Sequence, residues 1–135
     1  MIELDDIAPE FNFLLSKGFV LKSSVYCQKE FGNASLEICG AIFSVRLERD
    51  RGQLFVDLGS DSTGWYKLEY LIEFLDGSIA NEFAQLPEPK ILANLLETHW
   101  CRVVDLMTDT QKRADFQEFA KKKSTSLLRL LFGNA

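Results

Sequence analysis

The sequence predicts one α+β domain, residues 1–135, in which an antiparallel four-stranded meander sheet is combined with an N-terminal helix and three C-terminal helices. Two patterns predict this class. Apolar and polar residues alternate over short segments between residues 19 and 58, and apolar residues recur at helical spacing after residue 65. With 135 residues, 47% hydrophobic and 26% charged, the chain has the composition of an ordinary globular domain with one core.

The four expected strands follow one another with short connections, which makes each strand the antiparallel neighbour of the next. They are expected at residues 19–28, 34–39, 41–48 and 53–58. Between the last two, Asp50-Arg51-Gly52 predicts a type I turn closed by a left-handed glycine bulge. The final strand is apolar on both faces, with Phe55 facing away from the other apolar residues, so the sequence leaves its register open.

Cap and breaker residues predict the helix boundaries. The first helix is expected to start at Asp5 or Asp6 and to include Pro9 in its first turn. The second is expected at residues 65–76, where Gly77 follows, and the third from the segment 87–89 (Pro-Glu-Pro) to about residue 107. Each of these segments has an apolar stripe that predicts packing against the sheet.

The last helix is expected to begin at Thr108, because Thr108 and Gln111 have the spacing of a capping box. Hydroxyl side chains compete with helical backbone hydrogen bonds, so the segment 124–126 (Ser-Thr-Ser) can interrupt this helix. The sequence leaves open whether it is continuous.

Charge is distributed unevenly along a chain whose net charge is −5. Residues 1–110 contain 18 acidic and nine basic side chains, a balance of −9, whereas residues 111–135 have a balance of +4. An acidic body repels nucleic acid phosphates and attracts a basic partner. The run Lys121-Lys122-Lys123 has no interleaved aromatic residues and is interpreted as a solvated helix end, so no nucleic acid partner is expected.

Catalytic and metal sites are not expected, because the reactive residues are few and scattered. Cys27, Cys39 and Cys101 lie far apart and are interpreted as reduced core thiols. His99, the only histidine, falls on an apolar helix side and is expected to be buried and hydrogen-bonded. Asp57 and Asp61 have the side chains of a metal site or an acid–base pair, but acidic residues at strand ends and in loops are common for turn chemistry alone, which is the favoured interpretation. The expected protein is not an enzyme and has no cofactor and no bound metal.

Two features of the sequence predict a cytoplasmic location. The longest apolar runs are too short to cross a bilayer. The opening residues are acidic where a secretory signal has a basic region, so no membrane partner is expected.

The candidate partner-binding residues lie on the expected helix at residues 65–76 and in the loop before it. A step of 100° per residue gathers the leucines and Ile72 on a buried side and leaves tyrosines and carboxylates opposite them. Aromatic area beside charge is typical of a binding surface, and a solvated helix face is the alternative. The candidates are Asp61, Tyr66, Glu69, Tyr70, Glu73 and Asp76.

The middle of the chain resembles a family of small bacterial proteins, some of which are similar to immunity proteins of polymorphic or contact-dependent toxins. The resemblance covers about 40 residues and rests on Phe31-Gly32-Asn33, Arg46, Arg49-Asp50-Arg51-Gly52-Gln53, Val56-Asp57-Leu58-Gly59 and Trp65-Tyr66-Lys67-Leu68. It implies a small cytoplasmic protein without catalytic activity that binds and neutralises the C-terminal domain of a cognate toxin, typically a nuclease. A regulatory adaptor that binds another basic protein is the alternative, and an enzyme ranks third.

Overall fold

In the computed structural model, which describes residues 3–27, 33–77 and 88–132, the protein is an α+β fold built on one antiparallel sheet. The strand order is β1-β2-β3-β4-β5, a meander in which each strand pairs with the next along the chain. The strands are β1 (Val20–Cys27), β2 (Asn33–Cys39), β3 (Ser44–Asp50), β4 (Gln53–Ser60) and β5 (Gly64–Lys67). The meander is confirmed, with five strands in place of the expected four.

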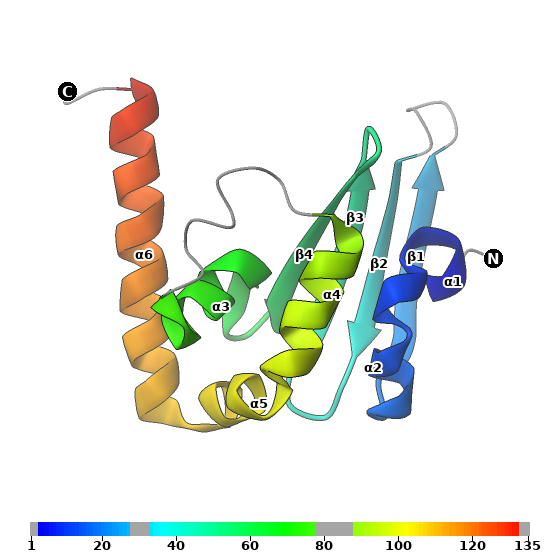
Figure 1. The fold of residues 1–135 in the computed structure, drawn as a ribbon, viewed down its shortest axis with the longest axis horizontal. Helices are drawn as coiled ribbons and strands as arrows, with labels where there is room; N and C mark the ends of the chain where they lie inside the picture. Colours follow the sequence, from blue (N-terminus) through cyan, green and yellow to red (C-terminus); the bar gives the residue numbers. More distant parts are fainter. Residues whose placement is uncertain (1–2, 28–32, 78–87, 133–135) are drawn as a thin grey trace.

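The helices form a layer over one face of this sheet and beside its β5 edge (Figure 1). They are α1 (Leu4–Ile7), the 3-10 turn η1 (Pro9–Phe11), α2 (Phe13–Ser16), α3 (Leu68–Leu75), α4 (Pro89–Thr98), α5 (Trp100–Thr108) and α6 (Thr110–Phe132). The N-terminal turns and α4 cover the strands, while α6 stands at the opposite side of the molecule from β1.

The predicted N-terminal helix is confirmed as a short helix only, because the segment from Leu4 to Ser16 forms three short helical turns in place of one continuous helix. Pro9 begins the second turn, since it lacks the amide hydrogen that a continuing helix needs. The N-cap of the first turn is Glu3, whose backbone N–H donates to Asp6 Oδ2 at 2.9 Å in a capping box.

The turn between β3 and β4 also differs from its prediction. Asp50 pairs directly with Gln53, which leaves a two-residue loop of Arg51 and Gly52 with φ of 53° and 82°. Two consecutive positive φ angles define a type I′ turn, whose twist matches that of the flanking strands better than a type I turn does. Asn33 Oδ1 accepts the Arg51 N–H at 3.0 Å and ties the loop to β2.

The helix predicted from Trp65 begins three residues later, at Leu68. Residues Gly64–Lys67 form β5 instead, in which Tyr66 pairs with Leu58 and Trp65 with Gly59. Gly64 has a φ of 94°, which allows the chain to reverse after β4. In β5 the backbone N–H and C=O groups that a helix would pair internally form hydrogen bonds with β4 instead.

The C-terminal helices differ from their predictions at two places, His99 and Asp109. The helix predicted from the segment 87–89 to about residue 107 begins at Pro89 and is divided at His99 into α4 and α5. The predicted capping box is wrong, because Asp109 Oδ1 accepts the N–H groups of Gln111 and Lys112 at 2.9 and 3.0 Å, while Thr108 donates backward to Val104 O. Helix α6 continues through residues 124–126 without interruption.

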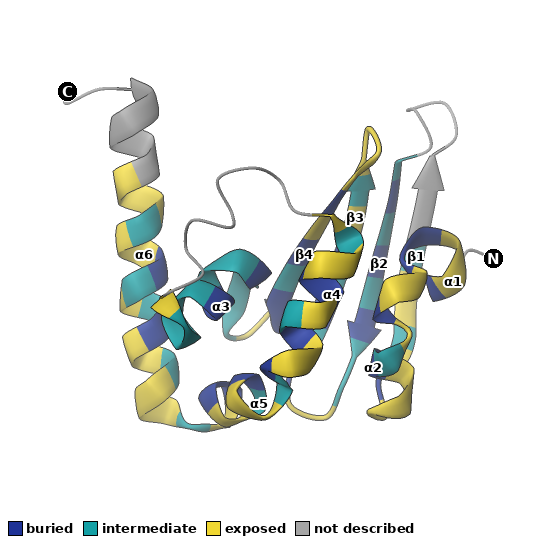
Figure 2. Ribbon diagram, in the orientation of Figure 1, coloured by how far each residue is buried: buried dark blue, intermediate teal, exposed yellow. Residues whose placement is uncertain are grey.

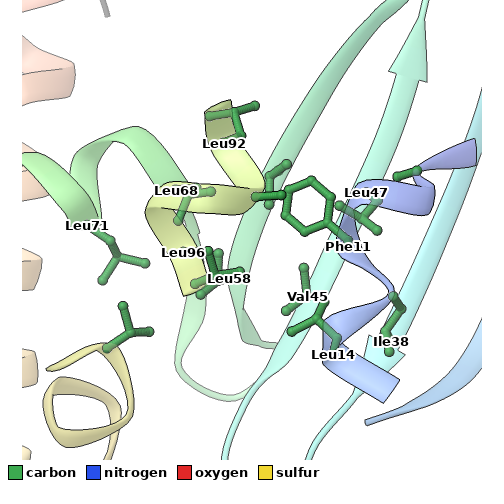
Figure 3. Close-up of a cluster of buried hydrophobic side chains, with 14 of the residues drawn as sticks. Phe11, Leu14, Ile38, Val45, Leu47, Leu58, Leu68, Leu71, Leu92 and Leu96 are labelled. Carbon is green, nitrogen blue, oxygen red and sulfur yellow. The ribbon is translucent and has the colours of Figure 1, made fainter. Parts of the chain in front are cut away.

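The core fills the space between the inner face of the sheet and the helices (Figures 2 and 3). Inward residues of β4 are buried and Phe55 points outward with 37% exposure, which settles the register that the sequence left open. Other fully buried side chains come from every layer and include Phe11, Leu14, Ile38, Leu47, Leu71, Leu96 and Phe116. One continuous apolar cluster therefore fixes the helices on this face.

Candidate functional site

The outer face of the sheet has a row of alternating charge that crosses four strands. Glu37 pairs with Arg46, Arg46 with Asp57, and Asp57 with Lys67. Directly opposite residues on one face of an antiparallel sheet have neighbouring side chains, so opposite charges in such a row stabilise the pairing. Two residues from Asp57 along β4, the exposed Phe55 faces the same side.

Arg46 is the centre of this face. Its Nε donates to Glu37 Oε1 at 3.3 Å, its Nη2 to Asp61 Oδ1 at 3.4 Å, and its Cζ lies 3.8 Å from the centre of the Trp65 indole ring. Trp65 Nε1 donates to the same Asp61 oxygen at 3.2 Å. The guanidinium is thus held by two carboxylates and one aromatic ring, an arrangement that fixes both Arg46 and Trp65 in place.

Gly59 lies on β4 next to this cluster. It pairs with Ser44 of β3 and with Trp65 of β5, and it is two residues along the strand from Asp57, the partner of Arg46. Its φ is 148°, and a Cβ there would lie 1.9 Å from the Gly64 carbonyl oxygen. Only glycine can therefore hold β4 and β5 at this approach, which fixes the position of the strand that bears Trp65.

Two carboxyl groups beside Lys67 are poorly solvated. Burial raises the pKa of Asp57, against the opposing attraction of Lys67 and Arg46. Burial also raises the pKa of Glu69. A backbone hydrogen bond and the charge of Lys67 lower this pKa in part, and the negative charge of Asp57 raises it slightly further. Desolvation of the charged form is the dominant cause for both groups.

The six residues predicted for partner binding are brought only partly to one surface. Asp61 belongs to the outer face, with 79% of its side chain exposed. Tyr66 points inward instead, where its ring lies 5.1 Å from that of Phe116 and its hydroxyl donates to Thr63 O. The water-facing helix side expected from the sequence is wrong, because α6 covers much of it.

The carboxylates of α3 illustrate this covering. Glu73 has a side-chain exposure of only 16% and forms an ion pair with Lys123 of α6 at 2.6 Å. Asp76 Oδ2 lies 3.9 Å from Nε2 of His99. Glu69 and Tyr70 are half-buried. Three predicted carboxylates thus have partners or partial burial within the fold and are not available as a free acidic row.

A groove of about 720 Å³ runs between β5, α3 and α6. Tyr66 and Tyr70 from the predicted set contribute to its wall, and Lys67 lies 5.6 Å from the Tyr70 ring centre. Its lining consists of Asp57, Trp65, Tyr66, Lys67, Tyr70, Gln117, Ala120, Lys121 and Ser124. The groove opens next to the outer face of the sheet, since Asp57, Trp65 and Lys67 belong to both.

The remaining candidates for chemistry lie apart from one another. His99 is 9% exposed and its Nδ1 contacts Leu95 O at 2.9 Å, which confirms the buried, hydrogen-bonded role predicted for it. Cys39 is half-buried and Cys101 is exposed, so the prediction of core thiols is wrong for these two, and the Cys27 side chain lies outside the described residues. Within residues 3–27, 33–77 and 88–132, no group of three potential metal ligands occurs.

The sequence did not indicate that Phe55, Arg46 and Trp65 share one face of the sheet. Arg46 and Asp57 alternate with apolar neighbours, which indicates that both side chains face outward from the sheet, but the sequence predicts a helix for the segment that forms β5.

In the part of the chain that the structure describes, no helix combines the length and apolar character needed to cross a membrane.

Comparison with protein-family models, with curated proteins and with solved structures finds no significant match for this chain.

Proposed function

We propose that this protein is an immunity protein that binds and neutralises the C-terminal domain of a polymorphic or contact-dependent toxin in the cytoplasm. A nuclease is the toxin class that suits an acidic inhibitor, because an acidic surface can occupy a cleft built for phosphates. The proposed binding surface is the outer face of the sheet. We prefer this face to the side of α3 predicted from the sequence, because Glu73 and Asp76 on α3 contact Lys123 and His99 within the fold.

The observation that supports this surface is that the exposed Phe55, two residues along β4 from the strand partner of Arg46, shares a face with the fixed Arg46–Trp65 stack, opposite the helical layer. Aromatic residues and arginine are the residue types most enriched at interface centres. A side chain that is already held in place loses less entropy on binding than a free one does, so the stack favours a binding role over a purely solvated face.

Charge supports a basic partner. On the outer face, the carboxylates of Glu37 and Asp61 pair with Lys22 and Arg46, Asp57 lies opposite Arg46 and Lys67, and Glu48 adds an exposed carboxylate. The acidic excess therefore belongs mainly to the domain as a whole. Residues 1–110, which include the whole sheet, have a balance of −9. Such a field accelerates the approach of a positively charged domain and makes the rate dependent on salt.

The proposal is tested by capture followed by an activity assay. The tagged protein is used to co-purify its partner from the native host, and the partner's C-terminal domain is then expressed and assayed with and without this protein. We expect a basic domain with nuclease or other toxic activity that one equivalent of this protein abolishes. A captured protein whose activity is unaffected, or that is not toxic, would establish the adaptor function instead.

A further inference from the structure

The groove between β5 and α6 runs along a free strand edge. Strand order places β5 at the end of the sheet, with β4 as its sheet neighbour. Successive residues of a strand point to opposite faces. Trp65 and Lys67 therefore face one side and Tyr66 the other, yet all three line the same groove. A groove lined from both faces of one strand has to follow the edge of that strand.

Within the part of the chain that the structure describes, β5 has no strand partner on this edge. Alternate residues of an edge strand turn their amide and carbonyl groups away from the sheet, and among the described residues no backbone hydrogen bond outside helices and sheet ladders involves Trp65 or Tyr66. Helix α6 forms the opposite wall with Gln117, which reaches across to donate to Thr63 O at 3.4 Å. An unpaired strand edge facing a helix across an open groove is the geometry into which an extended peptide adds as a further strand.

The charges of the lining select the peptide. Among the lining residues, Lys67 and Lys121 carry ammonium groups and Asp57 carries the one carboxyl group, while Glu69 lies beside Lys67 outside the lining. The lining therefore has a balance of +1 on a protein of net charge −5. The rings of Tyr66 and Tyr70 supply apolar area between these charges.

From this juxtaposition we propose that the groove binds an extended acidic peptide, which pairs with β5 and places carboxylate side chains at Lys67 and Lys121. Backbone pairing supplies part of the affinity, and alternate side chains of the peptide reach the tyrosine rings and the lysines. The site goes beyond the proposed immunity function, because it takes a segment of opposite charge to the domain expected on the outer face.

The test uses the acetylated and amidated peptide Val-Glu-Val-Glu-Val as probe, followed by the amide NMR signals of the full-length protein. We expect shifts at Trp65 and Lys67 and slower amide exchange there. The same peptide with lysine in place of glutamate should bind at least tenfold more weakly, because a charge-assisted contact becomes a repulsion. A peptide N-methylated at the residues that face β5 should lose binding, because it lacks the amide hydrogens that strand pairing needs. Undiminished binding of this peptide would overturn the pairing with β5.

Matched charge reversals on α6 locate the site. Lys121→Glu should weaken binding of the acidic peptide about tenfold, whereas Lys122→Glu, an equal charge change at an exposed residue outside the groove, should have a much smaller effect. Both side chains are exposed, so both variants should fold. Equal binding by the two variants, stronger binding of the lysine peptide, or shifts confined to another surface would overturn the proposal.

Discussion

The guanidinium of Arg46 lies 3.8 Å from the centre of the Trp65 indole ring, although the two residues belong to strands separated by β4. Asp61 accepts hydrogen bonds from both side chains, at 3.4 and 3.2 Å. This contact joins the last strand of the sheet to its centre on the outer face. It also fixes the position of the aromatic ring that we propose for partner binding.

Replacing Arg46 by lysine should separate stacking from charge. Lysine keeps the positive charge but lacks the planar group that lies over the indole and donates to two carboxylates, so we expect a loss of about 0.5–1 kcal/mol of stability. Urea unfolding of Arg46→Lys and Arg46→Ala measures it. If the lysine variant were as stable as the wild type, the stack would contribute nothing beyond its charge.

The type I′ turn predicts a position-specific effect of losing glycine. Gly52 has a φ of 82°, so Gly52→Val should lower stability by about 1 kcal/mol or more, because a β-branched residue is strained there. Gly77→Ala is the control, since Gly77 does not have this backbone conformation and a Cβ there meets no atom within 4 Å. Thermal unfolding of both variants provides the comparison, and equal melting temperatures would exclude the turn assigned here.

The ion pair between Glu73 and Lys123 connects α3 to α6, at 2.6 Å with Glu73 largely covered. Glu73→Lys should destabilise the fold by about 1–3 kcal/mol, because it opposes two positive charges at a partly buried site. Adding Lys123→Glu should restore much of the loss. A double-mutant cycle by chemical denaturation measures the coupling, and a swapped variant no more stable than Glu73→Lys alone would show that the pair does not hold α6 in place.

Stability should fall as pH rises through the range in which Asp57 and Glu69 ionise. Burial raises the pKa of both groups in the folded state, so the folded protein binds these protons more tightly than the unfolded chain does. Their contribution is fully present below the unfolded pKa of about 4 and is lost as pH rises through the folded pKa.

Asp57→Asn tests this sign. The variant should be at least as stable as the wild type at about pH 7, where the wild-type carboxylate is ionised, and the difference should shrink as the pH approaches 4. Thermal melts across this range give the answer. A variant that is clearly less stable at neutral pH would mean that attraction to Lys67 and Arg46 outweighs desolvation.

Local patterns in the sequence predict the first four strands well because each has its own alternation of apolar and polar residues. They fail at Trp65 for a physical reason. Residues 64–67 continue the helical spacing of Leu68, Leu71 and Ile72 backward, and a strand of four residues has too few positions to contradict it. Pairing with β4 is a long-range interaction, and it overrides the local preference.

The candidate site depended on this same element. With Trp65 in a helix, Tyr66 and Glu69 were placed on a free surface, and the approach of α6 to α3 through Phe74 and Phe116 was not visible in the sequence. Helix-to-helix packing depends on where a distant segment folds back, which periodicity within one segment does not encode. Asp61 is the one predicted candidate that lies exposed on the outer face.

The measurement that tests the central proposal most directly is the affinity of the outer face for the cognate domain. Phe55→Ala should weaken binding about tenfold or more if it is an interface anchor, and Glu48→Lys with Asp61→Lys should slow association and reduce its salt dependence. Glu97→Lys and Glu118→Lys, at exposed positions on α4 and α6, are the matched controls and should bind like the wild type. Wild-type affinity in the outer-face variants, with a loss in the controls, would contradict the account and place the interface on the helical side.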